Sequence, residues 1–168
     1  MKSLLVDKKL INRVKTPCIG VCSTGIGDSV CRGCKRFCHE VIGWNGFTEA
    51  QKQVIDQRLE AFLAQIVETK CRVTDEDLLR HQLQSQQIDF SSHKSPYIWI
   101  YELLRAGASQ LIDLNEYGFE LDAQYRQSDL RELRLAIDAE FFVLSEAHYQ
   151  RYFNAAADYE SAAVKEVG

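Results

Sequence analysis

The stretch from Pro17 to Cys38, PCIGVCSTGIGDSVCRGCKRFC, carries five of the six cysteines in this 168-residue chain. Their spacing is C-x3-C-x8-C-x2-C-x3-C. Two close pairs of cysteines joined by a short, turn-prone loop can surround one metal centre, because each short spacing fixes two thiolate ligands with few backbone torsions. The stretch therefore predicts a small metal-binding lobe, which the rest of the chain is expected to support.

The ligands are most simply the two pairs, since a thiolate-bound metal takes about four ligands. The predicted set is Cys18, Cys22, Cys31 and Cys34. Within the second pair, Gly33 is expected to adopt a positive φ that turns backbone N–H groups toward sulfur. Cys38 could replace one member of the set, but the usual pair spacing is met without it.

The other possible ligands add nothing to this set. Cys71 stands alone after a long helical pattern and is expected to be structural. The histidines show no ligand spacing with one another; they are His39, His81, His93 and His148. The order of the cysteines matches neither the bacterial nor the plant-type ferredoxin pattern, so spacing mildly favours a structural zinc ion. An iron–sulfur cluster stays open as the alternative.

Composition is that of a soluble globular protein, with 46% hydrophobic and 26% charged residues. No apolar run approaches the roughly 20 residues that a membrane helix needs, and we expect no membrane partner. The first nine residues lack the apolar stretch and cleavage site of a secretory signal. We therefore expect a cytoplasmic protein, in which clustered cysteines hold metal more often than they form disulfides.

Charge is distributed unevenly along the chain. Residues 1–40 hold eight Lys/Arg and three Asp/Glu, a balance of +5, whereas residues 41–168 have a balance of −9. A basic head could indicate a nucleic-acid partner. We favour charge compensation by Arg32, Lys35 and Arg36, because a zinc ion held by four thiolates carries a net charge of −2. The pI of 5.6 is also far from that of a typical nucleic-acid binder.

Apolar residues that follow the cysteines are expected to cover the lobe. Trp44, with Val41 and Ile42, is expected to pack over the metal lobe and to tie it to the next helix. The turn pair Asn45-Gly46 closes this region.

Helical periodicity dominates the chain after this turn. Thr48 and Gln51 form a capping box at the start of a helix expected over residues 49–69. The sequence predicts three later helices: one capped by Thr74 that ends near Gln86, one over residues 97–105, and a final long helix capped by Ser128.

Residues 111–121 break the helical pattern. Apolar residues alternate there around Asn115-Glu116, which predicts a short β-hairpin. The expected fold class is mainly α (α+β), with a cysteine-rich metal-binding lobe followed by a helical body. In this division, residues 1–46 form a basic arm and the lobe, and residues 47–168 form a mainly helical domain with the small hairpin.

The cysteine motif also resembles a known bacterial family. The run Pro17–Cys22, the run Cys31–Arg36, and then Glu40 and Trp44 are similar to a domain of unknown function that is defined by four cysteines. This family is often labelled a predicted iron–sulfur protein. The resemblance covers about residues 16–60 and implies the ligand set Cys18, Cys22, Cys31 and Cys34. Such domains usually carry another residue at position 38, so Cys38 departs from the pattern.

Three functions compete. We favour a non-catalytic interaction or regulatory module that binds metal and a protein partner, because a closed four-thiolate set leaves no open position for chemistry. The alternative is an iron–sulfur protein that transfers electrons or senses oxidants. A thiol–disulfide enzyme using Cys31 and Cys34 ranks last, since its motif needs a preceding strand in a βαβ unit. We do not expect an enzyme, because the sequence has no phosphate loop, nucleophile elbow or zinc-protease motif.

Overall fold

The computed structural model describes residues 13–165, with side chains described up to Phe153. Most of the predicted basic arm, residues 1–12, lies outside the described residues. The described helices are α1 (Cys38–Gly43), α2 (Glu49–Glu68), α3 (Glu76–Ser85), α4 (Pro96–Gly107) and α5 (Leu130–Lys165). Two short strands, β1 (Cys71–Val73) and β2 (Phe119–Leu121), form an antiparallel sheet. The predicted mainly helical fold with a small β element is confirmed.

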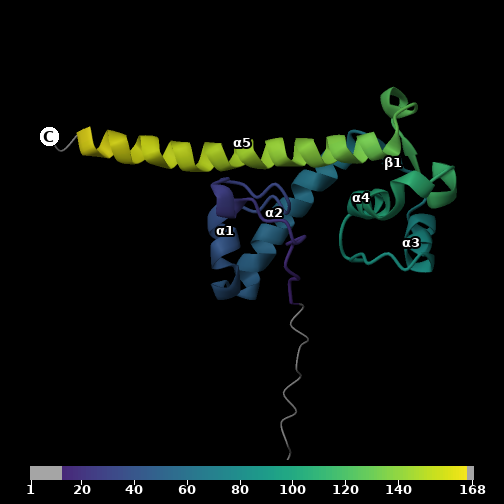
Figure 1. The fold of residues 1–168 in the computed structure, drawn as a ribbon, viewed down its shortest axis with the longest axis horizontal. Coiled ribbons are helices and arrows are strands. Elements are labelled where there is room, and N and C mark those ends of the chain that lie inside the picture. The colour runs from purple at the N-terminus through teal and green to yellow at the C-terminus, as the bar shows by residue number, and fades with distance from the viewer. Residues whose placement is uncertain (1–12, 166–168) are drawn as a thin grey trace, which may run out of the picture.

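Helix α5 sets the long axis of the molecule (Figure 1). The cysteine segment, α1 and α2 lie beneath its middle, whereas α3, α4 and the sheet gather near its N-terminal end. Helices α2, α4 and α5 pack against one another. Their contact surface is apolar and includes the buried side chains of Leu59, Leu63, Trp99, Leu103 and Ile137. The C-terminal part of α5 extends beyond the other elements.

Helix α2 begins at the predicted capping box. The Gln51 backbone N–H donates to Thr48 Oγ1 at 3.2 Å, and the Thr48 N–H donates to Gln51 Oε1 at 2.9 Å. These two bonds satisfy N–H groups that a helix start leaves without partners. The helix ends at Glu68, one residue before the predicted end.

At two other helices the capping residue lies one position after the predicted cap. Asp75, and not Thr74, accepts the N–H of Leu78 at 2.9 Å at the start of α3. Asp129, and not Ser128, accepts the N–H groups of Arg131 and Glu132 at the start of α5. A carboxylate at this position also interacts favourably with the positive end of the helix dipole, which explains why the aspartates take these positions.

The small sheet joins distant parts of the chain, so the predicted local hairpin over residues 111–121 is wrong. Residues Leu114–Tyr117 form a 3-10 helix, and β2 pairs with β1 in the register Cys71↔Leu121 and Val73↔Phe119. Gly118 reverses the chain between these elements with a φ of 76°. The pairing buries Phe119 completely, a burial that a hairpin on the surface would not give.

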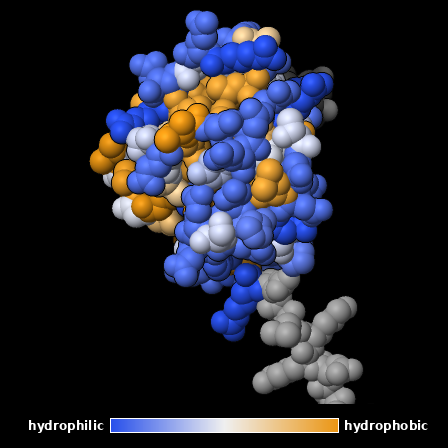
Figure 2. All heavy atoms as spheres, turned by 90° about the vertical axis from the view of Figure 1, so that its right-hand side faces the viewer, coloured by the Kyte–Doolittle hydropathy of each residue, from blue (hydrophilic) through white to orange (hydrophobic). Residues whose placement is uncertain are grey.

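One face of the molecule is mainly polar, with apolar side chains gathered on part of it. Figure 2 views the end of the molecule near α3 and α4 and shows such a patch among polar residues. Among the described residues, no helix is both long and apolar enough to cross a membrane.

We predict that Gly118→Ala destabilises the protein by at least about 2 kcal/mol. Alanine is strained at the positive φ of this position, and its Cβ would clash with a neighbouring segment. An added Cβ would lie 2.2 Å from the Asp75 carbonyl oxygen, which belongs to the loop that begins α3. Thermal unfolding followed by circular dichroism measures the change. Gly46→Ala is the matched control, since its Cβ would meet nothing within 4 Å. Equal melting temperatures for the two variants would contradict the prediction.

Candidate metal centre

Cys31 and Cys34 lie in the turn of a tight antiparallel loop. Val30 and Phe37 form an isolated β-bridge across the base of this loop. Above the bridge, the Cys31 N–H donates to the Arg36 carbonyl at 2.9 Å. Both cysteines are buried, with 1% and 7% of their surface exposed. The loop therefore holds the C-x2-C pair in a fixed position inside the lobe.

The residue that takes the positive φ in this turn is Lys35, so the prediction for Gly33 is wrong. Lys35 has a φ of 60°, and its N–H donates to the Cys31 carbonyl at 2.8 Å. Gly33 is needed for another reason. A Cβ at this position would lie 2.4 Å from the Val21 carbonyl oxygen and 3.1 Å from the Ile19 side chain. The missing side chain lets the segment between Cys18 and Cys22 rest on the second pair.

The Cys31 thiol donates to the Val21 carbonyl at 3.6 Å. Burial alone would raise the pKa of this thiol, but backbone N–H groups of Cys34, Ser23 and Gly33 outweigh that effect and lower it to about 7. One of these donors, Ser23, belongs to the loop that follows the first cysteine pair. Donors directed at sulfur favour the thiolate, which is the form that binds metal.

Cys34 lies beside a buried cation. The Arg36 Nε donates to the Cys34 sulfur at 3.2 Å, and the guanidinium group lies over the Trp44 ring, 4.7 Å from its centroid. Burial raises the pKa of Cys34 against the opposing effect of Arg36. Trp44 is buried as expected, but Ile42 is 83% exposed and does not cover the lobe.

The first pair is exposed and sits beside the second. Cys18 and Cys22 both lie at the surface. The Cys22 sulfur is 3.1 Å from Thr24 Oγ1, and the Ser23 hydroxyl accepts the Arg32 N–H at 2.9 Å. The cysteines of the two pairs are thus near each other. Among the described residues, however, no three His, Cys, Asp or Glu side chains are grouped in a way that could hold a metal ion.

The two remaining cysteines have different surroundings. The Cys38 sulfur is 4.0 Å from the Tyr149 hydroxyl on α5, at the limit of a hydrogen bond to sulfur. Cys71 is buried on β1, where burial raises its pKa to about 12. A thiol with such a pKa stays neutral and unreactive at pH 7, which agrees with the predicted structural role of Cys71.

The lobe is fastened to α2 and α5 by charged groups. Glu40 accepts two hydrogen bonds from Arg58 on α2, at 2.5 and 2.7 Å, and the Arg58 guanidinium lies over the Phe37 ring. The buried Lys35 ammonium contacts the Asp138 carboxylate on α5. These pairs could not be predicted from sequence patterns, because their members are far apart along the chain. They cross the predicted domain division after residue 46, which itself stays a prediction.

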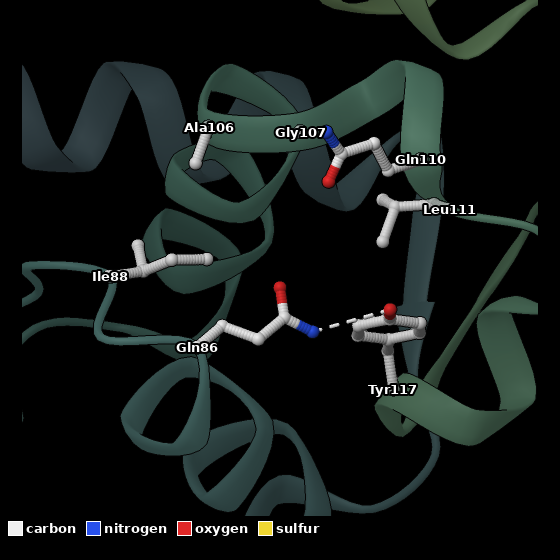
Figure 3. Close-up of a pocket in the computed structure, with 7 residues that line it drawn as sticks. All are labelled: Gln86, Ile88, Ala106, Gly107, Gln110, Leu111 and Tyr117. Atoms are coloured by element: carbon white, nitrogen blue, oxygen red, sulfur yellow. Dashed lines mark hydrogen bonds between the residues drawn. The ribbon is translucent and has the colours of Figure 1, made fainter.

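A separate cleft of about 440 Å³ lies between the ends of α3 and α4 (Figure 3). Its polar wall is formed by Gln86, Gln110 and Tyr117, and the Gln86 amide donates to the Tyr117 hydroxyl at 3.2 Å. Its apolar lining comes from Ile88 and Leu111, among others. The lining includes no carboxylate, amine, imidazole or thiol side chain, and Tyr117 is its one titratable residue.

Comparison with known families assigns the cysteine region. Residues 16–63 match DUF1289, which is described as a protein of unknown function. This segment is similar to the DUF1289 domain. The match agrees with the expected family of unknown function and nearly with its expected extent, 16–60, but it assigns no cofactor. The DUF1289 domain contains both cysteine pairs, α1, and α2 as far as Leu63. No curated protein and no solved structure matches the chain.

We predict that Gly33→Ala lowers the free energy of unfolding by about 1–3 kcal/mol, because the new methyl group must displace the Val21 carbonyl. Chemical unfolding of the reduced, metal-free protein measures this loss. Gly25→Ala is the control in the same lobe, since its Cβ would meet nothing within 4 Å. If both variants unfold at the same denaturant concentration, the two cysteine segments do not pack as described.

Proposed function

We propose that the DUF1289 domain holds one metal centre through Cys18, Cys22, Cys31 and Cys34, and that the protein acts as a non-catalytic interaction module in the cytoplasm. The observation that supports this most is the contact between Gly33 and the Val21 carbonyl. It brings the C-x3-C segment against the C-x2-C turn. Cys18 and Cys22 are exposed on this segment, and the proposal requires their side chains to rotate so that both sulfurs face the buried pair.

The surroundings of the buried pair fit a thiolate-bound metal. Backbone N–H groups of Cys34, Ser23 and Gly33 lower the pKa of Cys31, and the Arg36 side chain donates to the Cys34 sulfur. Both kinds of donor stabilise the negative charge that accumulates when several thiolates bind one centre. The donor set is all sulfur, which suits zinc or an iron–sulfur cluster and not the hard cations magnesium and calcium.

A zinc ion fits better than a cluster. The order of the cysteines matches neither the bacterial nor the plant-type ferredoxin pattern, which favours a single zinc ion over a multi-iron cluster. A zinc ion bound by four thiolates would cross-link the segments and stabilise the lobe, without redox chemistry. The cysteines themselves would position the ion, and the loops would shield the buried sulfurs from water.

The partner is proposed to be a protein. Three apolar side chains around the first cysteine pair are exposed: Ile19 at 56%, Val21 at 64% and Ile26 at 86%. Exposed apolar side chains grouped in one short segment are typical of protein interfaces. A nucleic-acid partner is less favoured, because Lys35 and Arg36 are buried and cannot reach a phosphate.

Metal analysis of the purified, reduced protein tests this proposal. We expect one zinc per chain and a colourless solution, whereas a brown protein that contains iron would favour the cluster. Cys31→Ser should release the metal, because the remaining three thiolates bind less strongly. Cys38→Ser is the matched control and should retain it, since the Cys38 sulfur lies beside Tyr149 on α5. Loss of metal from Cys38→Ser but not from Cys31→Ser would overturn the ligand assignment.

A further inference from the structure

Three cationic residues lie within or directly after the second cysteine pair: Arg32, Lys35 and Arg36. The first two are each paired with a carboxylate. The Arg32 side chain is 66% exposed, and its Nε lies 2.9 Å from Asp28 Oδ2. The Lys35 side chain is 2% exposed and contacts the Asp138 carboxylate. The charges of both residues are therefore compensated whether or not the centre holds metal.

Arg36 differs from both. It is 3% exposed, and among the described residues it forms no ion pair with a carboxylate. Its Nε donates to the Cys34 sulfur at 3.2 Å, and its guanidinium plane lies over Trp44. An aromatic face attracts a cation only weakly, and burial of a charge without an ionic partner is more costly than that attraction. Trp44 alone therefore cannot explain the position of Arg36.

We propose that Arg36 is the charge-compensating residue of the metal centre, and that it strengthens metal binding while contributing nothing to, or reducing, the stability of the empty lobe. This inference rests on the proposed function. A metal-bound cysteine carries a negative charge, so metal binding would place an anionic sulfur at the Arg36 Nε, which already donates to the Cys34 sulfur. Four thiolates around a zinc ion leave a net charge of −2, and the Arg36 guanidinium reduces it to −1.

Arg36 contacts one particular ligand of the proposed metal centre. Its Nε–H donates to the sulfur of one proposed ligand, Cys34, and the Trp44 ring holds the guanidinium plane in place. Hydrogen bonds from outside the coordination shell fix the orientation of a ligand, and their removal typically costs 10- to 100-fold in metal affinity. Arg36 is thus a positioning residue, and the metal does not contact it.

The test compares Arg36→Met with Arg32→Gln. Methionine keeps an unbranched apolar stem against Trp44 but removes the charge and the donor. The dissociation constant for Zn²⁺ is measured by competition with a chromophoric chelator, and the denaturation midpoint of the metal-free protein is measured separately. We expect Arg36→Met to weaken zinc binding 10- to 100-fold. Its metal-free midpoint should equal or exceed that of the unaltered protein, because a buried unpaired charge is removed.

Arg36→Lys provides a second variant that keeps the charge. It should lose less affinity than Arg36→Met, since the ammonium still compensates charge but cannot reproduce the planar donor. Arg32→Gln should bind zinc within about threefold of the unaltered protein, because Arg32 is exposed and paired with Asp28.

The outcomes separate this inference from the proposed function. If Arg36→Met binds zinc as tightly as the unaltered protein, or lowers the metal-free midpoint or prevents metal-free folding, Arg36 has only a packing role and the inference is overturned. The proposed function would survive either result. If the unaltered protein itself does not bind zinc, the proposed function fails, and the inference fails with it.

Discussion

The approach of the Gly33 backbone to the Val21 carbonyl is the contact on which the cysteine lobe depends. Any side chain at position 33 would force the two segments apart, because its Cβ would lie 2.4 Å from the carbonyl oxygen. This contact joins the exposed pair to the buried pair. The Ser23 hydroxyl, which accepts the Arg32 N–H, holds the same two segments together a few residues further on. The lobe is thereby built from two loops with little regular secondary structure of their own.

Such a lobe buries few apolar side chains, so its stability must come from elsewhere. Part of it comes from α2 and α5, through the Glu40–Arg58 pair and the Lys35–Asp138 pair. Buried ion pairs stabilise less than their Coulomb attraction suggests, but removal of one partner is strongly destabilising. They therefore fix how the lobe sits on the helices. A metal that binds only the folded lobe would add stability in proportion to the logarithm of its free concentration.

The parts of the structure that the sequence predicted well depend on local interactions. The start of α2 is an example, because Thr48 and Gln51 bond to each other's backbone within a single turn. The sheet was mispredicted because the alternation of Phe119 and Leu121 identifies a strand but not its partner, which here is the distant β1. The caps at Asp75 and Asp129 were each missed by one residue, since two capping side chains stand next to each other.

In the candidate site, too, the features that depend on local interactions were predicted and those that depend on distant residues were not. The C-x2-C spacing identified Cys31 and Cys34 as candidate ligands, and the turn that holds both is formed by hydrogen bonds between residues close in sequence. The role of Gly33 was mispredicted, because its importance comes from a neighbour twelve residues earlier, Val21, and not from its own φ. The sequence also placed three cations beside the cysteines without indicating which of them contacts sulfur. Only the folded structure distinguishes Arg36, which donates to a sulfur, from Arg32 and Lys35, which are paired with carboxylates.

The central claim is that four cysteine sulfurs bind one metal. X-ray absorption spectroscopy at the metal edge of the loaded protein tests it most directly, since it reports the kind, number and distance of the bound atoms. For zinc, the account predicts a shell of four sulfurs at about 2.3 Å. A shell that contains nitrogen or oxygen at about 2.0–2.1 Å would contradict it, because at least one of the four cysteines would then not be a ligand.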